Sequence, residues 1–219
     1  ERRVPLRRVI LALLRHGDTG IGTLQGLDGE LVILDGKAFQ VRGDGSVRAV
    51  ANDALTPFAV VTWMDDDQAV GPLDVESLDK LTALLDRALP SSNRFYAVRA
   101  HGTFARVRTR SVPRQEKPYR PLAEVAREQA VFDLRDVTGT LVGFRCPAFV
   151  RGVNVPGYHL HFLSDDRACG GHVLDVRAQG LTVHLDDSDA LFLALPRDNA
   201  FDSADLAADR EEELRRVEG

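Results

Sequence analysis

Three Asp-Gly pairs constrain the fold of this chain more than any other sequence feature. They are Asp28-Gly29, Asp35-Gly36 and Asp44-Gly45, and they separate short apolar runs at 30–34 and 39–42. An Asp-Gly pair between two such runs is the strongest short-range signal for a β-hairpin, because both residues tolerate the positive φ angles of tight turns. The sequence therefore predicts a meander of short strands in this region.

Patterns typical of helices and strands alternate along the rest of the chain. Apolar residues at helical spacing predict helices over 5–15, 74–89 and 122–129, and the acidic tail over 203–217 also has a helical pattern. Alternating or continuous apolar runs predict strands at 58–63, 95–102, 103–110, 131–134, 139–144, 158–163, 172–176 and 181–185. We expect a turn at His101-Gly102 between the second and third of these strands.

Together these patterns predict an α/β protein of the α+β type, with two β-rich lobes of mixed sheets and few flanking helices. We place an N-terminal β-sheet lobe at 1–125 and a C-terminal β-sheet lobe, with a terminal helix or tail, at 126–219. Residues 22–26 and 139–143 share the form Gly-Thr-Leu-x-Gly, and each opens a run of strands. The match is a weak sign of internal duplication, since five matched residues also arise by chance.

Composition narrows the class of protein. The chain has 219 residues, 44% of them apolar, which is enough to bury a sizeable core and argues against disorder. Its net charge is −5, and no cluster of Lys and Arg is interleaved with aromatic residues, which argues against a dedicated nucleic-acid binder. The two cysteines, Cys146 and Cys169, do not make a disulfide framework, so they favour a reducing compartment.

The longest apolar stretch near the start of the chain, residues 9–14, is too short to span a bilayer. Its flanks do not resemble a cleaved signal. We therefore expect a soluble, cytoplasmic protein that has no membrane partner. The chain begins with Glu1 rather than Met, so the sequence is also compatible with a leader removed upstream.

Three of the six histidines lie within fourteen residues. His159 and His161 are two apart, and side chains at i and i+2 of a strand leave the same face. After a polar turn, a second apolar run could return antiparallel and bring His172 beside them. Three neutral imidazoles around Zn²⁺ leave an open coordination position, which a catalytic metal needs.

The competing interpretation of the three histidines puts one in the core, one on the surface and one against a partner. We favour the metal site, with Cys169 as a bystander in the turn.

Five blocks of sequence occur in order between about residues 15 and 195 and so cover most of the chain. They are Gly-Ile-Gly-Thr-Leu-Gln-Gly-Leu-Asp-Gly-Glu-Leu at 20–31, Thr-Pro-Phe-Ala-Val-Val at 56–61, Arg-Ser-Val-Pro-Arg-Gln-Glu-Lys-Pro-Tyr at 110–119, Gly-Thr-Leu-Val-Gly-Phe at 139–144, and Gly-Tyr-His-Leu-His-Phe-Leu at 157–163 with Gly-Gly-His at 170–172. Taken together, these blocks closely resemble the bacterial α-acetolactate decarboxylases.

The resemblance implies a metal-dependent lyase that removes CO₂ from (S)-2-acetolactate to give (R)-acetoin, in acetoin and 2,3-butanediol biosynthesis. It also implies a homodimer of mixed α/β subunits and a divalent metal, for which we expect Zn²⁺. Carried over by motif, the metal ligands are His159, His161 and His172.

The same resemblance implies further site residues. Glu30 falls on a glutamate of the Leu-Asp-Gly-Glu block and would donate a proton to the enediolate; its alternative interpretation is a turn-flanking carboxylate. Arg110 opens the Arg-x-Val-Pro block and would bind the substrate carboxylate through a bidentate fork, although without the resemblance a solvated charge would be favoured. Glu218 best matches a second, C-terminal glutamate, with other glutamates nearby at 211–213. Thr23 is a candidate substrate contact or a structural residue.

A second hypothesis is a non-enzymatic module. The His-Leu-His strand followed by Gly-Gly-His also resembles the plant and prokaryote conserved domain of some DNA-associated proteins. Those domains are much shorter than this chain and lack the blocks around Glu30 and Arg110, and the chain has no basic tail or AT-hook. A decarboxylase acting on another 2-hydroxy-3-oxo acid is a third hypothesis. We favour 2-acetolactate as the partner, with no nucleic acid.

Overall fold

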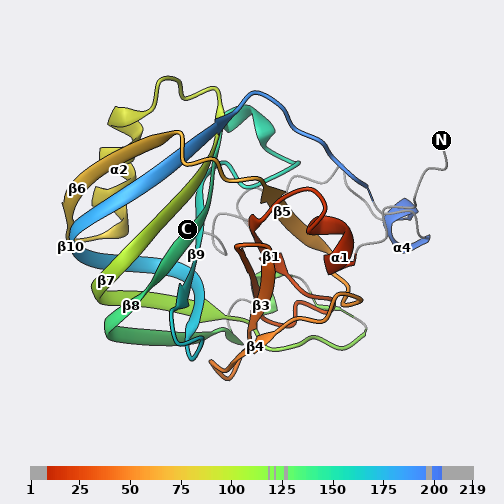
Figure 1. Cartoon of the computed structure of the whole chain (residues 1–219). Coiled ribbons are helices and arrows are strands. Elements are labelled where there is room, and N and C mark those ends of the chain that lie inside the picture. Colours follow the sequence, from red (N-terminus) through yellow and green to blue (C-terminus); the bar gives the residue numbers. More distant parts are fainter. Residues whose placement is uncertain (1–8, 118, 121, 126–127, 196–198, 204–219) are drawn as a thin grey trace.

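The computed structural model describes residues 9–117, 119–120, 122–125, 128–195 and 199–203. In this part of the chain, two five-stranded sheets carry a few short helices, as the sequence predicts (Figure 1). Every pairing between the described strands is antiparallel, so the sheets are not mixed as expected. The chain completes the first sheet before it begins the second.

The first sheet is the meander that the Asp-Gly pairs predict. Its strands are β1 (Thr19–Thr23), β2 (Glu30–Leu34), β3 (Lys37–Val41), β4 (Val47–Ala49) and β5 (Phe58–Thr62). They lie in the order β4-β3-β2-β1-β5. Asp35 and Gly36, with φ angles of 50° and 70°, form the two-residue turn between β2 and β3. This is the left-handed geometry that an Asp-Gly hairpin turn requires.

The second sheet is built from much longer strands. They are β6 (Gln68–Val75), β7 (Phe95–Ser111), β8 (Ala130–Cys146), β9 (Gly157–Ser164) and β10 (Gly170–Ser188). Their order is β6-β10-β7-β8-β9, and β9 also pairs with β10. Strands β7 to β10 therefore form a closed ring of four, and Figure 1 shows them curving around one another.

Strand β7 continues through His101 and Gly102, where the sequence-based prediction of a turn is wrong. His101 pairs with Thr140 and Gly102 pairs with Gly139, so the ladder to β8 is unbroken there. A Cβ atom at Gly102 would lie 3.3 Å from Leu181 Cδ1. The glycine thus leaves room for β10 against a bent strand, instead of reversing the chain.

In the sequence, the first sheet ends with β5 and the second begins with β6. The predicted lobe boundary between residues 125 and 126 lies later, between β7 and β8, which pair with each other along most of their length. The division of the chain into two lobes at that point stays a prediction. The two Gly-Thr-Leu-x-Gly segments begin in different sheets, the first in β1 and the second in β8.

Helices make up little of the part of the chain that the structure describes. They are α1 (Ile10–Leu13), α2 (Leu78–Ala88), α3 (Leu122–Val125), the 3₁₀ helix η2 (Ala148–Val150) and α4 (Asn199–Asp202). Helix α2 confirms the prediction over 74–89; the Ser77 side chain caps it by accepting from the Lys80 amide, and Leu81 and Leu85 are buried beneath it. Of the helix predicted over 5–15, residues 5–8 lie outside the described residues, and among residues 9–15 only Ile10–Leu13 are helical. The tail predicted as helical also lies outside them from residue 204.

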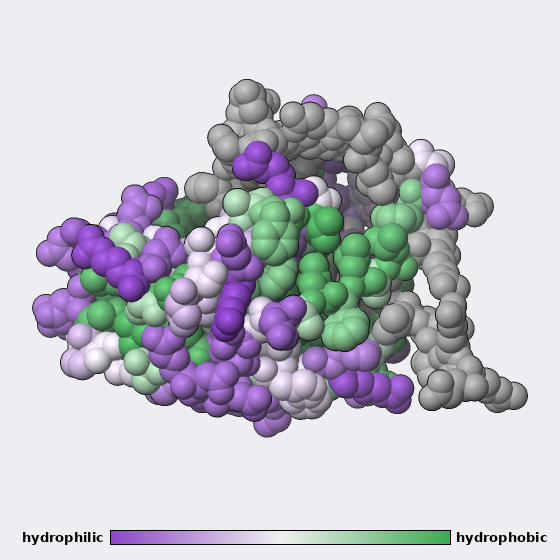
Figure 2. Space-filling view, turned by 90° about the horizontal axis from the view of Figure 1, so that it is seen from above, coloured by the Kyte–Doolittle hydropathy of each residue, from purple (hydrophilic) through white to green (hydrophobic). Residues whose placement is uncertain are grey.

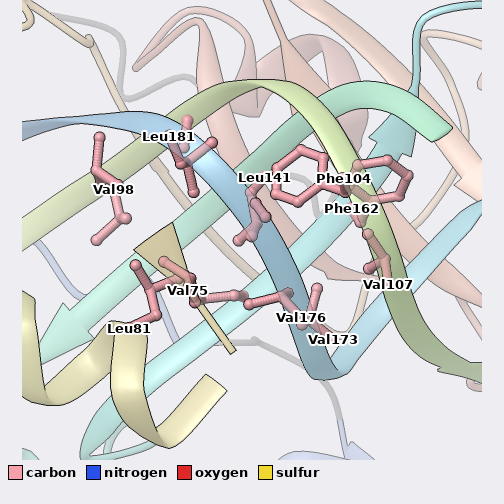
Figure 3. Packing of buried hydrophobic residues seen from close by; sticks show 14 of the residues in the cluster. Val75, Leu81, Val98, Phe104, Val107, Leu141, Phe162, Val173, Val176 and Leu181 are labelled. Atoms are coloured by element: carbon pink, nitrogen blue, oxygen red, sulfur yellow. The ribbon is translucent and has the colours of Figure 1, made fainter. Parts of the chain in front are cut away.

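The apolar core is divided by the second sheet. One cluster fills the space between the ring of strands and α2, and Figure 3 shows Phe104, Leu141 and Phe162 within it. A second cluster joins the two sheets and contains Val32 of the first sheet together with Val142 and Leu163 of the second. The site described below lies on this second side, where the sheets face each other.

Candidate metal centre

Strand β9 alternates between the two sides of its sheet. Leu160 and Phe162 are buried in the cluster beneath α2, so His159 and His161 point the other way, toward the first sheet. The β9–β10 hairpin then sets His172 directly opposite His161 in the strand register. The predicted antiparallel return is confirmed.

The three imidazoles converge. Their ring centroids lie 5.1 Å apart for His159 and His161, 4.9 Å for His159 and His172, and 5.5 Å for His161 and His172. One ring nitrogen of each lies within 4.8 Å of those of the other two, and the three side chains are buried. These residues could therefore hold a metal ion.

A hydrogen bond to the first sheet determines which ring nitrogen of His161 carries the proton. Its Nδ1 lies 2.9 Å from the carbonyl oxygen of Leu31, and a carbonyl only accepts, so Nδ1 carries the proton and donates. The lone pair of His161 is then on Nε2, which is buried and makes no hydrogen bond to the described residues. A metal-binding histidine is held by a backbone carbonyl in this way, with its other nitrogen turned to the ion.

Burial also keeps two of the rings neutral. It is the main cause that lowers the pKa of His161 well below its usual value, followed by the neighbouring His159. Burial likewise lowers the pKa of His172, followed by the positive charge of Arg110. A neutral imidazole is the form that binds a cation, so the donor set fits a divalent metal.

Arg110 lies beside the histidines because of the strand register. It is directly opposite His172 on the neighbouring strand β7, and its side chain is almost fully buried. Glu30 reaches the same place from the first residue of β2, across the gap between the sheets. Arg110 Nη1 lies 3.4 Å from Glu30 Oε1, and Glu30 Oε2 lies 3.5 Å from His161 Nε2.

The structure thus brings together five residues singled out in the sequence: a cation, a carboxylate and three imidazoles in one buried cluster. No metal-binding group of three or more His, Cys, Asp or Glu other than the three histidines occurs among the described residues. Cys169 does not join it; its carbonyl accepts from the amide and hydroxyl of Ser164, which closes the β9–β10 turn.

The structure describes Thr23 but not Glu218, the two remaining residues that the sequence singled out. Thr23 lies directly opposite Glu30 in the strand register, and its hydroxyl donates to the carbonyl of Gly29 at 2.7 Å. That bond supports the structural interpretation of Thr23, and its contact with substrate stays a prediction. Glu218 lies outside the described residues, so its place beside Glu30 stays a prediction as well.

Comparison with known proteins identifies the family to which the chain belongs. The family model described as "Alpha-acetolactate decarboxylase" matches residues 7–208, which is most of the chain. The chain belongs to the alpha-acetolactate decarboxylase family. It is therefore an enzyme of this type, and the hypothesis of a non-enzymatic DNA-associated module is not supported.

Individual members of the family cover nearly the whole chain. The alpha-acetolactate decarboxylase of Methanosarcina mazei is 46% identical over 206 residues, which span 94% of this chain and 72% of that protein. That of Methylococcus capsulatus is 45% identical over 206 residues, with 94% and 79% covered. The crystal structure of the alpha-acetolactate decarboxylase from Bacillus subtilis strain 168 superposes with a TM-score of 0.93 at 37% identity, covering 96% of this chain and 91% of that one.

Sequence reasoning missed two groups that contact the histidines of this family member. The Leu31 carbonyl holds His161, but a backbone acceptor leaves no mark in a side-chain pattern. Phe58 of β5 lies parallel to the His159 ring, at a centroid distance of 6.4 Å and an interplanar angle of 8°. Phe58 is part of a block that carried the family resemblance, which could have drawn attention to it.

Proposed function

We propose that this protein catalyses the metal-dependent decarboxylation of (S)-2-acetolactate to (R)-acetoin and CO₂. One observation supports this most strongly: three buried histidines face the Arg110–Glu30 pair at the junction of two sheets. The relatives named alpha-acetolactate decarboxylase support the same substrate. The protein would then act in the formation of acetoin and 2,3-butanediol.

His159, His161 and His172 would hold the cation, and we propose Zn²⁺. Three imidazoles with an open fourth position are a usual donor set for catalytic zinc. When bound, a divalent cation supplies Lewis-acid chemistry, which draws electron density from the substrate oxygens as the carbon–carbon bond breaks.

Arg110 would bind the carboxylate that leaves as CO₂. A guanidinium offers five N–H donors in a planar fork, so Arg110 can approach Glu30 and still present donors to a substrate carboxylate. Its almost complete burial strengthens such a charge-assisted contact, because little water competes for it. The contact would orient the carbon–carbon bond that is broken.

Glu30 would supply the proton that replaces CO₂. The substrate anion loses CO₂ and leaves an enediolate, and one proton added to carbon from Glu30 completes acetoin. The carboxylate of Glu30 then takes up a proton from solvent, so the cycle consumes one proton for each CO₂ released. Because Glu30 is fixed on one side of the cluster, it would deliver the proton to one face and so set the (R) configuration.

We also propose a cytoplasmic homodimer that binds neither nucleic acid nor membrane. Figure 2 shows a face on which apolar side chains gather, and large exposed apolar residues include Phe149 and Phe192, the latter 94% exposed. Exposed apolar surface of this kind is typical of protein–protein contacts. In the described part of the chain, no helix has the length and apolar character needed to cross a membrane.

The test combines acetoin formation from racemic 2-acetolactate with elemental analysis of the purified protein. We expect about one equivalent of metal per chain, loss of activity after chelation and recovery on adding the metal back. His159→Ala should lose both metal and activity. His101→Ala is a matched control, because His101 pairs with Asp165 on the surface. Full activity in metal-free protein would contradict the proposal.

A further inference from the structure

The turn that leads into Glu30 has a strained backbone. Gly26 and Gly29 have φ angles of 80° and 73°, which glycine adopts readily, but Leu27 between them has a φ of 53°. A leucine rarely adopts this left-handed conformation, because its Cβ approaches the neighbouring carbonyl. Such a conformation persists where surrounding contacts hold it in place.

Gln40 supplies such a contact. It lies on β3 with its side chain fully buried, and its Nε2 donates to the carbonyl of Asp28 within the turn. The orientation of the Gln40 amide is determined by Arg48 on β4. Arg48 Nε lies 2.5 Å from Gln40 Oε1, and since a guanidinium only donates, the amide oxygen must face it. The NH₂ group is thereby turned to Asp28.

Arg48 reinforces the same turn from outside. Its Nη2 lies 3.8 Å from the carboxylate of Asp28, so Arg48, Gln40 and Asp28 form a small network around the turn. The Arg48 side chain is more than half exposed, whereas Gln40 is buried. The side-chain amide of Gln40 bonds to both other residues and is therefore the central member of the network. We call this network the β3–β4 brace.

The brace lies next to the two groups of the first sheet that reach the candidate metal centre, the Glu30 carboxylate and the Leu31 carbonyl. The turn ends at Glu30, whose two carboxylate oxygens lie 3.4 Å from Arg110 and 3.5 Å from His161. In the strand register, Gln40 is directly opposite Leu31, whose carbonyl accepts from His161 Nδ1. A shift of the turn would therefore move the Glu30 carboxylate relative to both of its neighbours.

We propose that Gln40, oriented by Arg48, is a positioning residue of the decarboxylation: it holds the strained turn before Glu30 and so sets the direction of proton delivery. This inference rests on the proposed function. It makes a distinct prediction, because the Gln40 side chain bonds to Asp28 and Arg48 and not to a candidate metal ligand. Its loss should affect the rate of the step that uses Glu30, and leave substrate binding and metal content unchanged.

The experiment uses Gln40→Met, which keeps the length of the side chain and removes both amide contacts. Gln68→Met is the matched control, because Gln68 on β6 likewise donates to one backbone carbonyl, that of Ala88, away from the metal centre. We expect Gln40→Met to lower kcat about tenfold with KM within about twofold, since misplacing a catalytic group by a fraction of an ångström has effects of this order. Gln68→Met should keep the parent kcat.

A double-mutant cycle with Glu30→Gln separates positioning from a general loss of structure. If Gln40 acts through Glu30, Gln40→Met should cost about twofold or less once Glu30 is already replaced. An equal tenfold loss in both backgrounds, or a loss of bound metal in Gln40→Met, would show a structural role and overturn the proposal.

Should Gln40→Met fail to fold, the exposed Arg48→Met carries the same test, with an expected loss in kcat of about threefold that also disappears in the Glu30→Gln background. A parent protein that makes no acetoin contradicts the proposed function and with it this inference. An active parent with fully active Gln40→Met and Arg48→Met variants contradicts the inference alone.

Discussion

The two sheets contribute different chemical groups to the candidate metal centre. The second sheet supplies the three histidines and Arg110 from long strands that pair in a closed ring. The first sheet consists of strands of three to five residues, and it supplies the Glu30 carboxylate and the Leu31 carbonyl. The candidate metal ligands thus come from the more extensively paired sheet, and the proposed proton donor comes from a meander of short strands.

This difference suggests a division of tasks that mutations can test. Residues of the second sheet should govern whether the metal and the substrate carboxylate bind at all. Residues of the first sheet should govern the rate after both are bound. The following predictions run from the largest expected effect to the smallest.

Replacing His172 by alanine should have the largest effect. It removes one of three candidate ligands, and the described residues contain no second group of His, Cys, Asp or Glu that could hold a metal. We expect bound metal to fall below about a tenth of the parent content and acetoin formation to fall by about a thousandfold, because the Lewis acid that would polarise the substrate oxygens is lost with the metal. Elemental analysis and an acetoin assay measure both, with His184→Ala as a control outside the cluster. Retention of metal would contradict the assignment.

Glu30→Gln should separate the two sheets most clearly. The amide keeps the shape of the carboxyl group and can still accept from Arg110, but it cannot deliver a proton. We expect unchanged metal content and a loss in kcat of about a hundredfold to ten-thousandfold, the range typical of general acid catalysis. Loss of metal from this variant would show instead that the first sheet takes part in metal binding.

Arg110→Lys tests the carboxylate contact with the positive charge retained. Lysine keeps the buried charge beside Glu30, which avoids the larger cost of an unpaired carboxylate, but it lacks the planar fork. We expect KM for acetolactate to rise about tenfold to a hundredfold, with a smaller change in kcat and normal metal content. Steady-state kinetics measure the split. An unchanged KM would place the substrate carboxylate elsewhere.

The same comparison explains which parts of the molecule were predictable. Hairpins such as the one at Asp35-Gly36 depend on two adjacent residues, so local sequence was sufficient. The convergence of His159 and His161 follows from the two-residue period of a strand. The course of β7 through Gly102 depends on Gly139 and Leu181, which lie far away in sequence, so a local turn signal was misleading there.

Proximity of Glu30 to the histidines was not predictable from spacing at all. It depends on how one sheet packs on the other, and only the family resemblance indicated it. The Leu31 carbonyl and the Gln40 amide were missed for a related reason: both act through backbone groups of the first sheet, which no side-chain pattern reveals.

The smallest predicted effect concerns the segment that joins the two sheets. Asp186 near the end of β10 accepts from the amide of Asp65 at 3.4 Å, in the connection between β5 and β6. Partial burial, together with the charge of Asp67, raises the pKa of Asp186 from 3.8 to about 6. The folded state therefore holds this proton more tightly than the unfolded state, so stability should fall as pH rises from about 4 to about 6.

Asp186→Asn removes the charge and keeps an oxygen that can accept from Asp65. We expect the free energy of unfolding at pH 8 to rise by up to about 1 kcal/mol, a value reduced because the carboxyl group is only partly buried and solvent screens its charge. Near pH 4 the parent carboxyl is already mostly protonated in the folded state, so the variant should gain little there. Urea unfolding at both pH values measures this, and an equal gain at both would attribute the effect to packing instead of charge. Because Asp186 lies apart from the metal centre, kcat should stay at the parent value while the connection between the sheets becomes more stable.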